Sequence, residues 1–526
     1  MHQSNLEKIG LPADLVIINA TVRTLNPAQP KTQAIAITKN RIAKVGTNSE
    51  ISRLIDETTK VLNFEGKTVV PGLIDTHIHV ADFGRCLMWL DLGPAKSISE
   101  MQNLLKEKAG QTIAGKWIVG RGWNQAALKE KRMPTIQELD AAAPDNPVIL
   151  YHEVAMICAV NSKALQRAGV TNLTPEPKGG VISKDPKTGE LTGILRDAAT
   201  SLLWQFVPEP TVVELLELTA LACQKISLAG ITSVHWLVLS EVELSIIQNL
   251  YLMGRLPFRV NVVVPIALLE KTVRLKIGDD SVLRFGGVTL SVDGYLDSKK
   301  AALFEPYSDE PTNNGELFFT QKEFIASIKK VLVSGVQPII LAMGDKAISI
   351  TLDAIETIPK SNVRFRIEQA AVLNESLVKR LSEQGVVVSI QPKVVTSEFS
   401  VWSATTHLGL ERARWLHPLK SLLNEGVKIA AGSDCPMEPL NPLLGIHDLM
   451  LREAFPEQRL TAEEALRMYT LDAAYSSGEE TVKGSIEEGK LADLTILSAD
   501  PMVVAPEKIA DIAVEMIVVN GKIVVF

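Results

Sequence analysis

Cysteine is scarce in this sequence and forms no recognisable motif. The 526 residues include four cysteines that are far apart in the chain, namely Cys86, Cys158, Cys223 and Cys435. Because there is no CxxC pair, neither a zinc knuckle nor a disulfide framework is indicated. Isolated thiols of this kind are typical of proteins from a reducing compartment.

Long apolar runs and an excess of positive charge are also missing. No uninterrupted apolar stretch is long enough to span a bilayer, and Met1–Gly10 carries acids and amides where a signal peptide needs an apolar run. The net charge of −7 argues against a nucleic-acid partner, since phosphate binding needs a basic surface. We therefore expect a cytoplasmic protein that acts on a small molecule, without membrane or nucleic-acid partners. A homo-oligomer is left open.

Both ends of the chain are rich in β-forming residues. Near the start, short runs from Asp14 to Val70 are separated by Asn, Pro and Gly, and near the end similar runs lie between Asp493 and Phe526. Asn520-Gly521 is a strong signal for a hairpin turn. This pattern predicts one small β-sandwich made of residues 1–70 and 489–526. Two unrelated terminal hairpins are the alternative.

The middle of the chain, residues 71–488, alternates apolar strands with helical patterns. Capping signals of the form S/T-x-x-E mark the helix starts, for example Thr320 with Glu323 and Thr461 with Glu464. The eight candidate strands favour an α/β fold in which the strands form a closed (β/α)₈ barrel. The expected strand ends are Thr76-His77, Tyr151-His152, Val234-His235, Leu290-Ser291, Ile340-Leu341, Arg366-Ile367, Ile390-Gln391 and Ala431-Gly432. Residues from about 90 to 229 are predicted to form an insert over the barrel mouth.

The most specific chemical signal is the pair His77 and His79 at the end of the first strand. Residues two apart on a strand share a face, so both imidazoles can bind one metal. Imidazole suits Zn, Fe, Ni or Cu better than Mg or Ca. Asp434, after the last strand, can ligate the same ion or accept a proton from its water. Capping of the next helix is the alternative role for Asp434.

With these motifs the sequence resembles the amidohydrolase superfamily, in the branch that contains N-substituted formamide deformylases. The resemblance extends over nearly the whole chain. Matching segments are PGLIDTHIH at 71–79, WIVGRGWNQ at 117–125, VNSKAL at 160–165, GITSVH at 230–235, DGYLDSKKAAL at 293–303, GSDCPMEPLNP at 432–442, KLADLTIL at 490–497 and VVNGKIV at 518–524. The resemblance implies a metal-dependent hydrolase of C–N bonds on a (β/α)₈ barrel.

Three positions on the predicted barrel strands depart from the family pattern, and Met156 in the insert stands where the family has a further histidine. Thr289 stands where the family has a lysine that is often carbamylated, and Leu341 and Gln369 stand where it has histidines. A two-metal centre is therefore not expected. We predict a single divalent transition metal, zinc before others, held by His77, His79 and Asp434, or no metal at all.

The substrate pocket is predicted from residues at other strand ends and in the insert. The candidates are Trp123, His152, Glu153, His235 and Gln369. Asp434 is the predicted catalytic residue, because it can accept the proton of the attacking water.

Two functions are consistent with the sequence. The first is a hydrolase that cleaves an amide, formamide or cyclic amide with activated water. The second is a catalytically degenerate binding protein on the same scaffold, which the lost lysine and histidines would favour.

Overall fold

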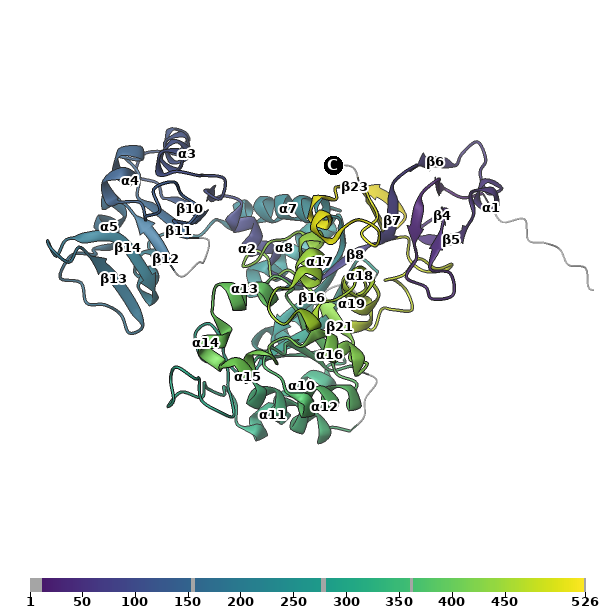
Figure 1. The fold of residues 1–526 in the computed structure, drawn as a ribbon. Helices are drawn as coiled ribbons and strands as arrows, with labels where there is room; N and C mark the ends of the chain where they lie inside the picture. Colours follow the sequence, from purple (N-terminus) through teal and green to yellow (C-terminus); the bar gives the residue numbers. More distant parts are fainter. Residues whose placement is uncertain (1–11, 153–156, 276–280, 360–362, 525–526) are drawn as a thin grey trace, which may run out of the picture. The chain divides into compact units, whose positions relative to one another are not determined.

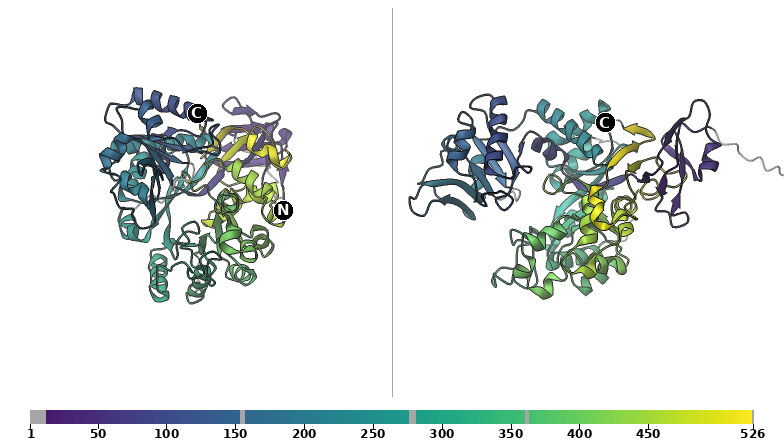
Figure 2. Two further views of the ribbon diagram at one scale, coloured as in Figure 1. Left: turned by 60° about the vertical axis from the view of Figure 1, so that its left-hand side comes forward. Right: turned by 45° about the horizontal axis from the view of Figure 1, so that its top comes forward.

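The structure is a computed structural model that describes residues 12–152, 157–275, 281–359 and 363–524 (Figure 1). It divides into two compact units. One comprises residues 1–83 and 219–526, and the other comprises Gly84–Leu218. The first contains the barrel and the terminal strands, and the course of the chain through both units can be followed in Figure 2.

The barrel is an eight-stranded parallel sheet. In sheet order its strands are β8 (Leu73–Ile78), β15 (Ile231–Leu237), β16 (Arg259–Pro265), β17 (Leu283–Ser291), β18 (Gln337–Ala342), β19 (Arg366–Gln369), β20 (Val387–Ile390) and β21 (Ile429–Ala431). Most of their residues are buried, as expected for a parallel sheet covered by helices. The prediction of a (β/α)₈ barrel is confirmed.

One predicted barrel strand is wrong. The strand that ends at Tyr151-His152, β11 (Val148–His152), belongs to the sheet of the Gly84–Leu218 unit. The barrel strand that the sequence reasoning missed is β16, which pairs with β15 and β17. His152 is therefore not at the end of a barrel strand.

Helices between the barrel strands begin where the capping signals predict. Thr320 and Thr461 close complete capping boxes with Glu323 and Glu464. The main helices that follow barrel strands are α8 (Glu241–Leu252), α9 (Leu269–Leu275), α10 (Gln321–Val333), α11 (Asp345–Glu356), α12 (Glu375–Glu383), α13 (Val394–Ser400), α16 (Leu419–Asn424), α17 (Pro442–Leu451), α18 (Ala462–Met468) and α19 (Leu471–Ser476). Among the described residues, none of the helices is both long and apolar enough to cross a bilayer.

Strands from both ends of the chain pair with one another. A six-stranded sheet has the order β24 (Lys522–Val524), β23 (Val514–Val519), β22 (Leu494–Leu497), β7 (Thr68–Pro71), β2 (Thr21–Arg23) and β3 (Lys31–Thr32). A four-stranded sheet has the order β5 (Arg41–Gly46), β4 (Ala34–Thr38), β1 (Leu15–Ile18) and β6 (Lys60–Asn63). Apolar side chains from both sheets, including Ile17, Val22, Ile35 and Leu494, share one core.

The turn between β23 and β24 has the predicted chemistry. Asn520 and Gly521 have φ of 55° and 74°, as a two-residue hairpin of this kind requires.

The Gly84–Leu218 unit has a sheet and a core of its own. In sheet order its strands are β13 (Gly180–Lys184), β14 (Leu191–Asp197), β12 (Ile157–Val160), β11, β10 (Ile118–Trp123) and β9 (Leu90–Asp91), accompanied by α3 (Ile98–Gln111), α4 (Ile136–Ala142), α5 (Ser162–Ala168) and α6 (Ser201–Trp204). α7 (Val212–Leu228) extends across the boundary between the two units.

Candidate metal and active site

Three side chains converge between the first and last barrel strands. His77 and His79 come from β8 and the residue after it, and Asp434 follows β21. The Nε2 atoms of His77 and His79 lie 3.5 and 3.3 Å from Oδ1 of Asp434. One ligand atom from each of the three residues lies within 4.8 Å of the others. Two imidazoles and one carboxylate therefore face a common point.

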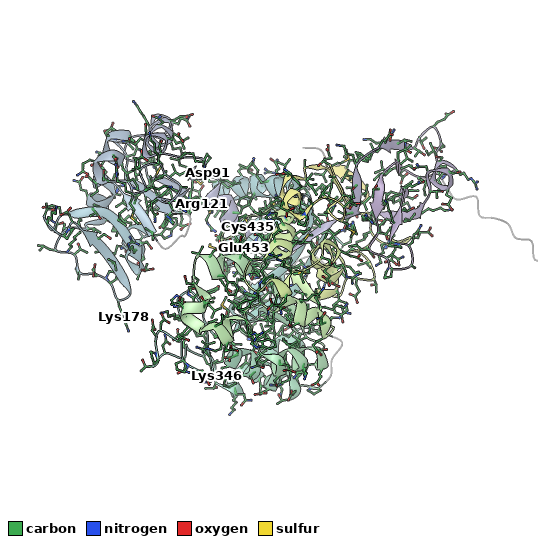
Figure 3. The ribbon with its side chains drawn as sticks, in the orientation of Figure 1. Asp91, Arg121, Lys178, Lys346, Cys435 and Glu453 are labelled. Atoms are coloured by element: carbon green, nitrogen blue, oxygen red, sulfur yellow. The ribbon has the colours of Figure 1, made fainter. Side chains whose placement is uncertain are left out.

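Backbone contacts bring these two strand ends together. The amide of Asp434 donates to the carbonyl of His77 at 2.7 Å, and the amide of His79 donates to the carbonyl of Cys435 at 3.0 Å. Cys435 is labelled in Figure 3 and marks this loop. Gly432 allows the approach, because a Cβ atom there would lie 2.4 Å from the backbone nitrogen of His77. The closure of the barrel therefore builds the cluster.

A buried carboxylate orients the ring of His77. Nδ1 of His77 lies 2.8 Å from Oε2 of Glu368, and the Glu368 side chain has no exposed surface. A carboxylate can only accept, so Nδ1 of His77 carries the hydrogen. Nε2 is then the nitrogen that faces Asp434 and that could bind a metal. This is the usual outer-shell partner of a metal-binding histidine.

Glu368 is in turn paired with Arg366. The Arg366 guanidinium is fully buried and forms an ion pair with Glu368. It also lies 2.7 Å from Nδ1 of His235 and donates at 2.6 Å to the carbonyl of Thr76 and at 3.1 Å to Oγ of Ser389. Because an arginine can only donate, His235 accepts through Nδ1. These contacts hold Glu368, and through it His77, in one position.

The pKa shifts follow from burial and from these ion pairs. Burial by itself lowers the pKa of His77, but the nearby Glu368 and Asp434 carboxylates raise it above its usual value overall. Burial raises the pKa of Glu368, and the charges of Arg366 and His77 outweigh burial and lower it. Burial, followed by the charge of Arg366, holds the pKa of His235 well below its ordinary range, so this imidazole is neutral.

The donor set fits a transition metal of the zinc type. Two imidazole nitrogens and one carboxylate oxygen are a common three-residue set for catalytic zinc. In a tetrahedral site with bonds of about 2.1 Å, neighbouring ligand atoms are about 3.4 Å apart. The two histidine–carboxylate distances of 3.5 and 3.3 Å match that separation. Two of the three ligand-atom separations therefore already suit one such ion, and the third is within 4.8 Å.

The three departures from the family pattern lie on neighbouring strands of the same barrel. Thr289 is near the end of β17, Leu341 near the end of β18, and Gln369 ends β19. Strand pairing places Leu341 beside both Ser291 and Glu368. This chain has a threonine, a leucine and an amide at the positions where the resemblance implies a lysine and two imidazoles.

The remaining predicted pocket residues have different surroundings. His235 is completely buried in the barrel against Arg366, which favours a positioning role over contact with substrate. In the Gly84–Leu218 unit, the Trp123 side chain is buried, donates from Nε1 to the carbonyl of Leu150 at 2.8 Å and packs edge-on against His152. This burial favours a structural role for Trp123. Glu153 lies outside the described residues.

The insert also places two charged side chains on neighbouring strands. Asp91 on β9 is paired in register with Arg121 on β10, and both are labelled in Figure 3.

Sequence reasoning missed Glu368 and Arg366 as parts of the site. Both lie on β19, whose four residues are all buried. A signal was available, because two opposite charges at alternate positions of an apolar barrel strand face the interior together. Such charges are rarely buried unless they are paired.

Known proteins are similar to this chain in sequence and in fold. The profile of the amidohydrolase family matches residues 60–525. The protein LONG AFTER FAR-RED 3 of Arabidopsis thaliana is 33% identical over 520 residues, covering 93% of this chain and 88% of that protein. The N-substituted formamide deformylase of Arthrobacter pascens is 29% identical over 535 residues and covers 97% of each chain.

A solved structure is similar over the same span. The crystal structure of an uncharacterized metal-dependent hydrolase from Pyrococcus furiosus superposes with a TM-score of 0.76 at 31% identity, covering 93% of this chain and 99% of that one.

Proposed function

Because the chain belongs to the amidohydrolase family, we propose that it is a metal-dependent hydrolase that cleaves a C–N bond of a small amide, formamide or cyclic amide. The observation that carries this proposal is the convergence of His77, His79 and Asp434 at the end of the barrel. A similar hydrolase structure and a formamide deformylase relative support the reaction class.

The three converging side chains are the ones that would hold the metal. A divalent transition ion, with zinc as the first candidate, would lower the pKa of water and polarise the substrate carbonyl when bound. His77 presents Nε2 because Glu368 fixes its Nδ1 hydrogen. Glu368 therefore holds the ring with Nε2 facing Asp434 before an ion arrives.

Asp434 is the proposed catalytic residue. Its carboxylate accepts the proton of the attacking water while the water oxygen forms a bond to the carbonyl carbon. As the C–N bond breaks, Asp434 returns that proton to the leaving nitrogen, so the products are an acid and an amine. The backbone of Asp434 is held at a φ of 56°, in the left-handed region. Such backbone conformations are concentrated at functional sites.

A second candidate function is a binding protein without catalysis. The observation that favours it is the loss of three family ligands, at Thr289, Leu341 and Gln369. Each of these changes removes a strong metal donor, so affinity for a second ion would be lost first. The intact trio of His77, His79 and Asp434 favours the hydrolase.

The test is hydrolysis of a panel of formamides, open-chain amides and ring amides by protein supplied with zinc. We expect amine release that falls at least about a hundredfold in Asp434→Asn, since removing a positioned general base costs about 10²–10⁴-fold. A protein that is folded and metal-loaded, yet releases no amine from the panel, would favour the binding function.

A further inference from the structure

Two buried glutamines lie at the ends of adjacent barrel strands. Gln369 ends β19, and Gln391 directly follows β20. The two strands are parallel and pair Glu368 with Ser389, so both glutamines come just beyond the last paired residues. Gln369 is 4% exposed and Gln391 is 1% exposed. Two carboxamides are therefore buried at the same edge of the barrel.

These carboxamides lack the partners that burial normally requires. Within the described ranges, Oε1 of Gln369 and both Oε1 and Nε2 of Gln391 have no hydrogen-bond partner. A buried amide left unpaired is costly, and native proteins nearly always pair such groups with protein, water or ligand. The two side chains therefore offer unused donors and acceptors.

Gln391 lies in the same layer of the barrel as the metal-binding candidates. Pairing of Ile390 with Ala431 puts Gln391 beside Gly432, and Gly432 packs against the backbone of His77. Alternation along the strand puts Gln391 on the face of Ser389. Ser389 accepts a hydrogen bond from Arg366 inside the barrel. Gln391 thus belongs to the inner face, one strand away from the loop that carries Asp434.

The backbone at Gln369 is strained in the way that ligand sites often are. Gln369 and Ala370 have φ of 71° and 41°, so two consecutive residues other than glycine are in the left-handed region. This conformation is uncommon and persists where the surrounding structure enforces it, often at ligand sites. It is an observation independent of the missing hydrogen bonds.

A carboxamide side chain is complementary to one particular arrangement of hydrogen-bonding groups. It presents one N–H and its C=O side by side, so its best partner offers C=O and N–H side by side in return. Ring amides and cyclic ureides have this arrangement, because the ring holds the amide bond cis and so keeps its N–H and C=O side by side. An open-chain secondary amide is trans, so its N–H and C=O point in opposite directions. A carboxylate has no donor and would also be repelled by Asp434.

We propose that Gln369 and Gln391 form a substrate subsite that binds the paired N–H and C=O of a neutral ring amide or cyclic ureide. This proposal rests on the proposed hydrolase function, for which it narrows the substrate class. The subsite holds the ring by its amide edge next to His77, His79 and Asp434. The amide of Gln369, at the position where the resemblance implies an imidazole, then binds the substrate.

The test compares δ-valerolactam with N-methyl-δ-valerolactam, which has the same ring without the N–H. Binding to the full-length protein as purified is followed by ligand-observed NMR. We expect the N-methyl compound to bind about tenfold more weakly, and Gln391→Met and Gln369→Met each to weaken lactam binding by about the same factor. Gln384→Met is the matched control, because Gln384 bonds Glu356 at 2.6 Å on the outside of the barrel. It should leave lactam binding unchanged.

Thermal unfolding of the same variants without ligand separates recognition from a structural role. Replacing an unpaired buried amide with an apolar side chain of similar shape should leave the melting temperature unchanged or raise it. Equal binding of the two lactams, or a clear loss of stability in both Gln391→Met and Gln369→Met, would overturn the subsite and assign these amides to internal water. If lactam binding depends on Gln391 but no C–N bond is cleaved, the subsite is supported and the hydrolase function fails.

Discussion

Nδ1 of His77 lies 2.8 Å from Oε2 of Glu368, although the two residues are 291 positions apart in the sequence. This contact joins the first barrel strand to the sixth and fixes which nitrogen of His77 is free. Arg366 neutralises Glu368 from the other side. The orientation of His77, a candidate metal ligand, therefore depends on the buried ion pair of Glu368 and Arg366, neither of which is itself a candidate ligand.

Glu368→Gln should weaken metal binding while leaving the three ligand side chains in place. Losing an outer-shell partner of a histidine typically costs about 10–100-fold in metal affinity. The change also leaves the buried Arg366 charge unpaired, which should cost about 3–5 kcal/mol of stability. Competition with a chromophoric chelator and urea unfolding measure the two effects. Glu375→Gln, at an exposed pair with Lys379, is the control and should change stability by less than about 0.5 kcal/mol.

Restoring the missing imidazoles should strengthen the metal site. Leu341→His and Gln369→His together should increase metal content and retention, because each adds a strong nitrogen donor on a neighbouring strand. Elemental mass spectrometry after dialysis measures both. A folded double variant that gains neither metal nor amide hydrolysis would show that the missing imidazoles do not limit the site.

Gly432→Ala should disturb the closure of the barrel. The added Cβ would lie 2.4 Å from the backbone nitrogen of His77, so β8 and the loop after β21 would have to separate. We expect about 1–3 kcal/mol of destabilisation, as for other overpacked sites, together with weaker metal retention. Gly110→Ala is the matched control, because a Cβ there meets nothing within 4 Å and the residue lies in α3. If both variants behave alike, the close approach is not needed.

The carboxyl group of Glu438 should make stability depend on pH. Burial raises its pKa to about 7, with further contributions from the charges of Asp434 and Asp448. The folded protein then keeps this proton up to about pH 7, whereas the unfolded chain releases it near the ordinary glutamate pKa of 4.5. The stabilisation is fully present below about pH 4.5 and is lost as the pH rises through about 7.

Unfolding of metal-depleted protein across this pH range tests whether stability falls as the pH rises. The free energy of unfolding should fall by about 1–2 kcal/mol after allowing for partial exposure of the side chain. Glu438→Gln should flatten this part of the profile. A profile that is unchanged in Glu438→Gln would assign the pH dependence to other groups.

Local patterns in the sequence predicted much of the fold. Capping boxes, the hairpin turn at Asn520-Gly521 and the His77/His79 pair depend on neighbouring residues, and each has the geometry that its pattern predicts. The alternation of candidate strands with helical patterns, and then the family resemblance, indicated the barrel.

Long-range pairing was harder to predict. β10, α4 and β11 repeat the strand–helix–strand pattern of a barrel unit, and β10 and β11 are parallel. β11 is separated from the barrel by its partners, β10 and the antiparallel β12, and these pairings depend on contacts across the sheet. Sequence reasoning missed the contact of Glu368 with His77 for the same reason. Alternation along a strand predicts the face of the sheet on which a side chain lies, but not the residue that it contacts.

Metal stoichiometry tests the central claim most directly. Full-length protein purified without chelator and equilibrated with zinc is analysed by elemental mass spectrometry, beside the double variant His77→Ala/His79→Ala. The geometry predicts about one transition-metal ion per chain, because the described residues bring one imidazole–imidazole–carboxylate set together. The ion should be absent from the double variant. Two tightly held ions in the unmodified protein, or one retained after both histidines are replaced, would contradict the account.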